Sequence, residues 1–338
     1  MQGVTFNMKK IILSLALTSG AAFAAASASA ADNYAAGNPL VDEFIQEMAA
    51  EHGFIPESLH KVFAEANKKQ NILDAISRPA ERVKTWKEYR PIFITQQRID
   101  RGLQFWQKNQ EALARAEAEY GVPAEYIVAI IGVETMYGGN TGGHRVIDAL
   151  STLSFDYPPR APFFRGQLKE FLLLTREEQI NPLVPTGSYA GAMGLPQFMP
   201  GSFRAYAVDF DHDGHIDIWT NPTDAIGSVA NYFIKHKWQP GEEVVVRAKV
   251  SGDKVDQGLG EKIDDTKSVA ELAKLGWQPE KPLPADLQVM TFKFEGVKGT
   301  EYWMGLQNFN TITRYNRSTM YSMAVHDLAQ LIKKARKD

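Results

Sequence analysis

The sequence of 338 residues contains no cysteine. Disulfide bonds and lipid attachment to a cysteine are therefore excluded, and a buried core or a bound metal has to supply stability. A net charge of only −3 argues against a dedicated nucleic-acid binder, which would carry a basic face. The chain also lacks the G-x-S-x-G motif of serine hydrolases and the H-E-x-x-H motif of zinc proteases, so neither chemistry is predicted.

Long hydrophobic runs are confined to the N-terminus. Two lysines precede an apolar run that is too short to span a bilayer comfortably, and a small-x-small triplet ends at Ala30. We therefore expect residues 1–31 to be a signal peptide that is cleaved near Ala30 or Ala31. The mature protein is expected to be soluble in a bacterial periplasm, and without a cysteine it is not expected to be a lipoprotein.

The rest of the chain is predicted to be mainly helical, with a short β region. Residues 39–120 and 121–180 contain stretches with apolar residues every three or four positions, the period of an amphipathic helix. Residues 241–300 instead contain clusters of β-branched residues separated by turn signals, which predicts a small β element. A last amphipathic helix has Ser318 as a plausible N-cap. The predicted fold class is mainly α, of the α+β type.

One glutamate ends an almost unbroken apolar run, EYIVAIIGVETMYGGN (125–140). Glu134 shares a helix face with Ile127, Ile130 and Ile131, so we expect it to point toward the core. Burial and the nearby helix C-terminus both disfavour the charged form and raise the pKa. A carboxyl group that stays protonated near neutral pH can act as a general acid. The alternative is a glutamate that pairs with a buried arginine or reaches the surface.

The segment TGSYAGAMGLPQFMPGSF (186–203) is rich in glycine and proline. Glycines let a backbone approach a ligand closely, and rigid turns would hold the side chains of Ser188 and Gln197 in place. The segment is therefore a candidate ligand-binding loop. A plain connecting loop would have the same composition, and this alternative stays open.

A second candidate binding segment, NFNTITRYNRSTMY (308–321), lies near the C-terminus. It places Asn310, Tyr315, Asn316 and Tyr321 among few aliphatic residues. Aromatic rings beside amides suit sugars, which offer apolar C–H faces rimmed by hydroxyl groups. The alternative is the start of a helix that faces the core.

The acidic segment DFDHDGHIDIW (209–219) has the spacing of an EF-hand calcium loop. Gly214 and Ile216 occupy the glycine and apolar positions of such a loop, whereas Thr220 stands where a closing glutamate is expected. A later carboxylate could close the loop instead. We predict one structural Ca²⁺. Its ligands are expected to be the side chains of Asp209, Asp211, Asp213 and Asp224 and the backbone carbonyl of His215.

Taken in order, these segments resemble the lytic murein transglycosylase B family. The resemblance covers most of the mature chain and is strongest from about 121 to 236. Five segments carry it: VETMYGGNTG, TLSFDYPPRAPFFRGQL, GSYAGAMGLPQFMPGSF, the acidic loop running into DAIGSVANYF, and ITRYNRSTMYSMAV. Some family members are lipoproteins, and without a cysteine this chain resembles the soluble form.

The resemblance implies a fold and a division of the chain. A lysozyme-like catalytic core, with an EF-hand-like calcium loop, would lie beside a helical domain and a small antiparallel β domain. The implied parts are a signal peptide (1–31), the helical domain (32–100), the catalytic core (101–240), the β domain (241–300) and a C-terminal helical segment that returns to the core (301–338).

The resemblance also implies the activity and its residues. Family members cleave the β-1,4 bond between N-acetylmuramic acid and N-acetylglucosamine in peptidoglycan and leave a 1,6-anhydromuramyl end. Glu134 matches the single catalytic acid/base. The matched glycan-cleft positions are Ser188, Gln197, Tyr232, Tyr315, Asn316, Tyr321, Tyr89 and Arg160. The implied partners are glycan strands and complexes for cell-wall synthesis or hydrolysis, without nucleic acid or an organic cofactor, and the protein is expected to be a monomer.

Two other functions stay open at this point. A hydrolase of the goose-lysozyme type would use Asp148 or Asp156 to guide a water molecule, because ordinary glycosidases employ two carboxylates. A non-catalytic peptidoglycan-binding protein could use the same cleft. An anhydro-forming enzyme needs only one carboxylate, since the muramic C6 hydroxyl attacks C1 within the same sugar.

Overall fold

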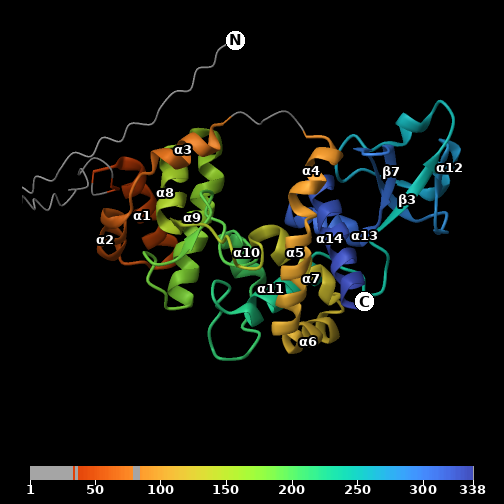
Figure 1. Ribbon diagram of the computed structural model, residues 1–338. Helices are drawn as coiled ribbons and strands as arrows, with labels where there is room; N and C mark the ends of the chain where they lie inside the picture. The colour runs from red at the N-terminus through yellow and green to blue at the C-terminus, as the bar shows by residue number, and fades with distance from the viewer. Residues whose placement is uncertain (1–32, 35–36, 79–83, 338) are drawn as a thin grey trace, which may run out of the picture. The chain divides into compact units, whose positions relative to one another are not determined.

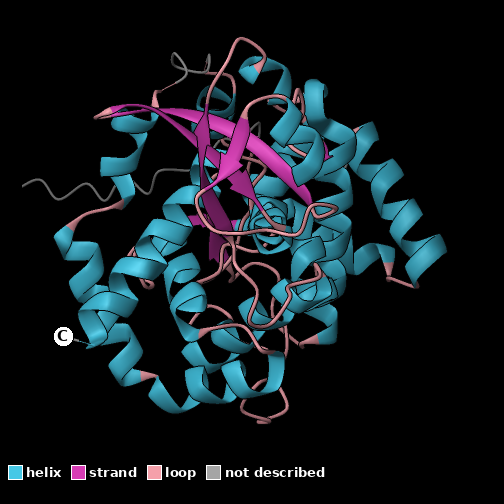
Figure 2. Cartoon of the chain, turned by 90° about the vertical axis from the view of Figure 1, so that its right-hand side faces the viewer, coloured by secondary structure: helices cyan, strands magenta, loops and turns pink. Residues whose placement is uncertain are grey.

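The computed structural model describes residues 33–34, 37–78 and 84–337. The predicted signal peptide, residues 1–31, lies outside the described residues. Within the described ranges, no helix has the length and apolar character needed to cross a membrane. The fold is mainly helical with a five-stranded antiparallel sheet (Figure 2), which confirms the predicted fold class.

Helices from the start of the chain pack with two helices from its middle (Figure 1). Asn38 caps the first helix by accepting a hydrogen bond from the amide of Leu40 at 3.1 Å. The ring of Phe155 lies 6.0 Å from those of Phe44 and Phe63, both edge-on, and fastens the two groups. The elements are α1 Pro39–His52, α2 Pro56–Glu65, α3 Gln70–Ile76, α8 Val146–Phe155, the 3-10 turn Pro158–Arg160 and α9 Ala161–Glu177.

The helix that carries Glu134, α7 (Ala124–Thr135), is enclosed by other helices. Its residues from Ile127 to Ile131 are fully buried, because the helix is apolar on all sides. It contacts α5, α6, α11 and α14. The surrounding helices are α4 Trp86–Phe93, α5 Gln96–Lys108, α6 Gln110–Tyr120, α10 Pro200–Tyr206, α11 Pro222–Lys235, α13 Gln307–Tyr315 and α14 Thr319–Lys337.

The five-stranded sheet has the strand order β4-β6-β7-β3-β5, and every neighbouring pair is antiparallel. One group of its side chains, with Trp277 fully buried, packs with helix α12 (Val269–Lys274). Another group joins the helical core, where Phe292 stacks on Phe309 of α13 at 4.7 Å. The strands are β3 Val245–Val250, β4 Thr266–Ser268, β5 Trp277–Pro279, β6 Gln288–Gly296 and β7 Gly299–Gly305, and the 3-10 turn Val255–Gly258 follows β3.

The last strand leads directly into the helices that return to the core. The predicted boundary at residue 300 falls inside β7, because pairing with β6 continues to Gly305. Leu306 then begins α13 as its N-cap residue. The division of the chain into separate domains stays a prediction.

Candidate active site

Glu134 lies in the last turn of α7, beside a tight reversal of the chain. Met136 and Tyr137, which follow it, have φ of 52° and 61°, in the left-handed region that non-glycine residues rarely adopt. Such strain is typically retained where function requires a particular backbone path. The Glu134 side chain is partly exposed, and its Oε1 accepts a hydrogen bond from the Tyr321 hydroxyl at 2.5 Å.

The environment of Glu134 favours its protonated form. Burial raises the pKa of the Glu134 carboxyl to about 7, although the hydrogen bond from Tyr321 acts in the opposite direction. Desolvation therefore outweighs the hydrogen bond. Near neutral pH a substantial fraction of the molecules carries a proton on Glu134, which is what a general acid requires.

Three tyrosines from three other helices interact with this carboxyl group, Tyr321 through a hydrogen bond and the other two through its charge. Tyr321 belongs to α14, Tyr315 ends α13 and Tyr89 lies in α4. Burial raises the pKa of each phenol, and the charge of Glu134 raises it further. Tyr232 of α11 adjoins this group, since its ring lies 4.7 Å from that of Tyr315. The predicted tyrosines are thus brought together from distant parts of the sequence.

The glycine-rich loop is fastened to the end of α7. Thr135 donates a hydrogen bond to the carbonyl of Leu195 at 3.0 Å, and Gln197 donates through Nε2 to the carbonyl of Thr141 at 3.1 Å. The Tyr315 hydroxyl donates to the carbonyl of Pro196 at 2.6 Å. These bonds place the loop against both Glu134 and the tyrosines.

Ser188 and Gln197 both have constrained conformations within this loop. The Ser188 hydroxyl oxygen accepts from the amides of Ala190 and Ala192, at 3.3 and 3.0 Å. Gln197 has a left-handed φ of 51°, and its Nε2 also donates to the carbonyl of Gly194 at 3.0 Å. Its Nε2 is therefore held by backbone carbonyls. The loop begins with β2 (Thr186–Gly187), which pairs with β1 (His144–Arg145) in a short antiparallel ribbon.

Two predicted site residues, Asn316 and Arg160, are exposed and have no described contact with Glu134. Asn316 is exposed in the connection between α13 and α14, directly after Tyr315. Arg160 is exposed near the start of α9, where its guanidinium lies 4.5 Å from the ring centre of Phe163. Among the described residues, no hydrogen bond or ion pair joins Arg160 to Glu134. Roles for Asn316 and Arg160 in glycan binding stay predictions.

The aspartates that a hydrolase would need are engaged elsewhere. Arg145 holds Asp148 through two hydrogen bonds of 3.0 and 2.8 Å, and the amide of Asn67 donates to the same carboxylate at 2.9 Å. Asp156 accepts from Tyr34 and from Lys68, both at 2.5 Å. Both carboxylates therefore tie the first helices to α8, which leaves no evident role for them in guiding water beside Glu134.

Neighbours of Tyr232 were not predicted from the sequence. His236 stacks on Tyr232 at 4.0 Å, and Tyr206 meets the same ring edge-on at 4.9 Å. His236, the C-cap residue of α11, follows Tyr232 by four residues, a spacing that places both on one helix face. That spacing could have indicated His236, whereas Tyr206 comes from α10 and left no local signal. Thr135, which directly follows Glu134, was also missed.

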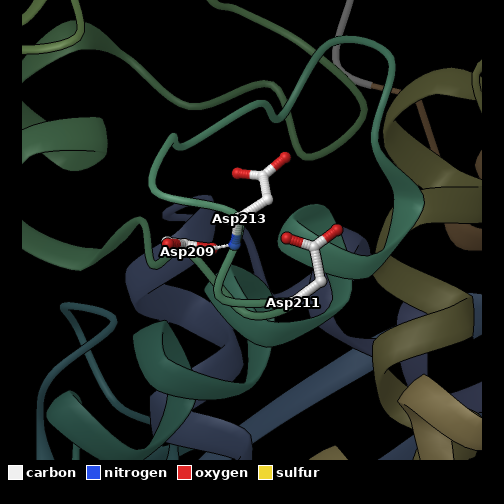
Figure 3. Close-up of side chains that lie close together, drawn as sticks. All are labelled: Asp209, Asp211 and Asp213. Atoms are coloured by element: carbon white, nitrogen blue, oxygen red, sulfur yellow. Dashed lines mark hydrogen bonds between the residues drawn. The ribbon is translucent and has the colours of Figure 1, made fainter.

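The acidic loop brings its first three aspartates together (Figure 3). Carboxylate oxygens of Asp209, Asp211 and Asp213 lie within 4.8 Å of one another. Asp209 also accepts from the amides of Asp213 and Gly214, at 3.1 and 2.9 Å, which folds the loop back on its first residue. Hard carboxylate oxygens converging in this way fit the ligand preference of Ca²⁺.

Asp224 has a different environment from the other predicted ligands. It is fully buried at the start of α11, and its two oxygens accept from the amides of Phe210 and Asp217, at 2.7 and 2.8 Å. Asp224 thus holds the loop near both of its ends, at Phe210 and at Asp217. His215 is exposed to solvent. Its contribution of a backbone carbonyl to the metal site stays a prediction.

Comparison with known proteins identifies the family of this chain. Residues 36–330 match the transglycosylase SLT domain family. The chain is 44% identical over 310 residues to the membrane-bound lytic murein transglycosylase B of Escherichia coli (strain K12), across 89% of this chain and 84% of the relative.

Solved structures show the same relationship. The soluble lytic transglycosylase SltB1 from Pseudomonas aeruginosa matches with 61% identity and a TM-score of 0.86, over 89% of this chain and 100% of that one. The E. coli lytic transglycosylase Slt35 in complex with calcium matches with 44% identity and a TM-score of 0.83, over 91% of this chain and 97% of that one. The chain therefore belongs to the transglycosylase SLT domain family, in the lytic murein transglycosylase B group with its lysozyme-like fold.

Proposed function

We propose that this protein is a lytic transglycosylase of peptidoglycan. It cleaves the β-1,4 bond between N-acetylmuramic acid and N-acetylglucosamine and leaves a 1,6-anhydromuramyl end. The observation that carries the proposal is the single carboxyl group, Glu134, with a pKa raised to about 7 among tyrosines of three helices. The named relatives, all lytic transglycosylases, support the same activity.

One carboxyl group can carry out both proton transfers of this reaction. Glu134 first donates its proton to the glycosidic oxygen, and the bond between that oxygen and C1 breaks. The carboxylate then accepts the proton of the muramic C6 hydroxyl as its oxygen attacks C1, which closes the anhydro ring and restores the acid. The attack is intramolecular, so it benefits from a high effective concentration. The Tyr321 hydroxyl stabilises the carboxylate between the two transfers.

The remaining site residues would bind the glycan. Tyr89, Tyr232 and Tyr315 offer ring faces and hydroxyls, which suit the apolar faces and polar rims of sugars. Ser188 is the candidate to orient the substrate's N-acetyl group, which stabilises the positive charge at C1. Matched positions Gln197, Asn316 and Arg160 complete the proposed glycan contacts.

Product analysis tests the proposed function. Purified murein sacculi are digested and the released muropeptides are weighed by mass spectrometry. We expect anhydro products, whereas a hydrolase of the goose-lysozyme type would release products heavier by one water molecule. A non-catalytic binding protein would leave the turbidity of the sacculi unchanged.

The Tyr321→Phe variant is expected to work to a higher pH than the parent enzyme. The Tyr321 hydroxyl lowers the pKa of Glu134, so its removal raises that pKa above about 7. The acid form then persists to higher pH, and the alkaline decline of kcat/KM moves upward. The measurement is the pH profile of anhydromuropeptide release. Tyr302→Phe, in strand β7, is the matched control, and an alkaline limb that stays or moves down in Tyr321→Phe contradicts the assignment.

We also propose that the acidic loop binds one structural Ca²⁺. Asp209, Asp211 and Asp213 would hold the ion, with the His215 carbonyl and Asp224 supporting the loop. The ion would offset the mutual repulsion of the three carboxylates and take no part in the reaction. The convergence of these carboxylates and the calcium complex of a relative support the proposal.

Calorimetric titration of metal-stripped protein tests the calcium site. We expect uptake of Ca²⁺ at millimolar concentration or below and a higher melting temperature with calcium. Asp211→Asn should weaken the affinity for Ca²⁺ by about tenfold, because it removes the charge of one ligand. A tenfold change corresponds to about 1.4 kcal/mol of binding free energy. Asp253→Asn, in an exposed turn, should bind as the parent does. Absence of uptake at millimolar calcium would rule the site out.

We further propose that the enzyme acts on glycan strands as a soluble periplasmic monomer. The signal-like segment 1–31 and the absence of cysteine support the periplasmic and soluble parts of this proposal. Cell fractionation followed by N-terminal sequencing tests this, with a mature N-terminus expected near Ala30 or Ala31. Recovery of the uncleaved chain in the membrane fraction would contradict it.

A further inference from the structure

Arg98 is a buried cation that pairs with no carboxylate of the described residues. It lies in the first turn of α5 and is 8% exposed. Burying a guanidinium without a counter-charge is costly, and a protein retains such a group only where its hydrogen bonds compensate. The sequence had left open that Glu134 pairs with a buried arginine, but the hydrogen bonds of Arg98 run elsewhere.

Three backbone carbonyls accept the hydrogen bonds of Arg98. Nη1 donates to the carbonyls of Ile92 and Phe93, both at 2.8 Å, at the C-terminal end of α4. Nε donates to the carbonyl of Gly132 at 3.0 Å, in α7. Both acceptor groups lie near helix C-termini, where the helix dipole favours a cation. A side chain of α5 thus joins α4 to α7.

Each of these two helices carries a residue of the candidate active site. Gly132 precedes Glu134 by two residues on α7. On α4, the ring of Phe93 lies 5.1 Å from that of Tyr89, and the Arg98 guanidinium lies 5.3 Å from the centre of the Phe93 ring. Tyr89 is close enough to Glu134 for its charge to raise the phenol pKa.

We propose that Arg98 is a positioning residue, which fixes the end of α4, and with it Tyr89, relative to the end of α7 that carries Glu134. This inference rests on the proposed function, because it concerns the geometry around the acid. Arg98 acts through the two helix ends and does not touch the substrate. Its planar guanidinium serves acceptors on two helices at once, which the compact ammonium of a lysine cannot do in the same geometry.

The Arg98→Lys variant tests the role. The titratable groups that face Glu134 are Tyr89, Tyr315 and Tyr321. If α4 withdraws, the Glu134 carboxyl becomes more exposed to water and its pKa falls from about 7 toward the ordinary 4.5. We expect kcat to fall by about tenfold to a hundredfold with a smaller change in KM, since a displacement of about 1 Å has effects of this size. The alkaline limb of the pH profile should move down.

A readout that is independent of activity accompanies the kinetics. Carbon-13 NMR titration of labelled glutamates follows the Glu134 carboxyl, identified by the signal lost in Glu134→Gln. Phe93→Leu, at a partly exposed position, is the second variant. It removes the ring between Arg98 and Tyr89 and is expected to shift the same titration downward by less. This variant decides the question if Arg98→Lys fails to fold.

The control is Arg204→Lys, which weakens the ion pairs of α10 with Glu170 and Glu177 of α9. It should lower the melting temperature and leave the pH profile and the titration unchanged. A folded Arg98→Lys protein, or Phe93→Leu in its place, that keeps the parent's kcat and titration overturns the positioning role. A parent enzyme that releases no anhydro products refutes the proposed function instead, so the two failures are distinguishable.

Discussion

Replacing Glu134 by glutamine is expected to reduce release of anhydromuropeptides from murein sacculi by roughly 10²- to 10⁴-fold, the usual contribution of a general acid–base group. Glutamine keeps the shape of the side chain and can still accept a hydrogen bond from Tyr321. It carries no proton for the glycosidic oxygen and cannot accept one from the C6 hydroxyl. Binding to sacculi should remain close to that of the parent, because the tyrosines and the glycine-rich loop are unchanged.

Glu125→Gln is the matched control on the same helix. Glu125 is 4% exposed and pairs with Lys333 at 2.6 Å, at the opposite end of α7 from Glu134. Its replacement should lower the melting temperature and leave the rate per folded molecule unchanged. If Glu134→Gln releases anhydro products at the parent rate, the role assigned to Glu134 is wrong.

Replacing Gly194 by alanine is expected to cause the largest loss of stability among the predicted substitutions, together with a loss of activity. Gly194 has φ of +66°, and an added Cβ would lie 2.4 Å from the carbonyl oxygen of Ile218. That carbonyl accepts the amide of Leu195 at 2.9 Å and so holds the glycine-rich loop to the acidic loop. Relief of the clash must move backbone, which displaces the loop that carries Gln197.

Gly53→Ala separates the two causes of this loss. Gly53 has the same φ of +66°, but an added Cβ would meet nothing within 4 Å. Gly53→Ala should lower the free energy of unfolding by about 1–2 kcal/mol, through the strain of the left-handed backbone alone. Gly194→Ala should lower the free energy of unfolding by about 1–3 kcal/mol more, the usual range for overpacking, because of its clash with Ile218. Urea unfolding measures both, and equal losses would show that Ile218 yields without cost.

Local features of the active site were readable from the sequence. The apolar positions at three, four and seven residues before Glu134 predicted a helix and an inward-facing carboxyl group; α7 is that helix, and its Glu134, although partly exposed, accepts a hydrogen bond from the buried Tyr321. The spacing of Asp209, Asp211 and Asp213 predicted their convergence. These patterns depend on helix and turn geometry over a few residues, which is why the sequence alone suffices.

The partners of other polar residues could not be predicted from local spacing. Asp148 and Asp156 were candidates to guide water, but they hold Arg145, Tyr34 and Lys68. Asp224 was predicted as a ligand; its oxygens accept two loop amides, and its role as a ligand stays a prediction. A carboxylate has the same local pattern whether it binds water, a metal or a neighbouring chain segment, so only its surroundings decide.

The sequence by itself determined the helical class, the small sheet, the inward-facing Glu134 and the acidic loop, because each follows from spacing between near neighbours. Only the tertiary structure decided that Tyr89, Tyr315 and Tyr321 meet at one carboxyl group and that Arg98 joins the helices beneath it. Tyr321 lies 187 residues from Glu134 along the chain. Contacts over such separations depend on how whole helices pack, and no local period encodes them.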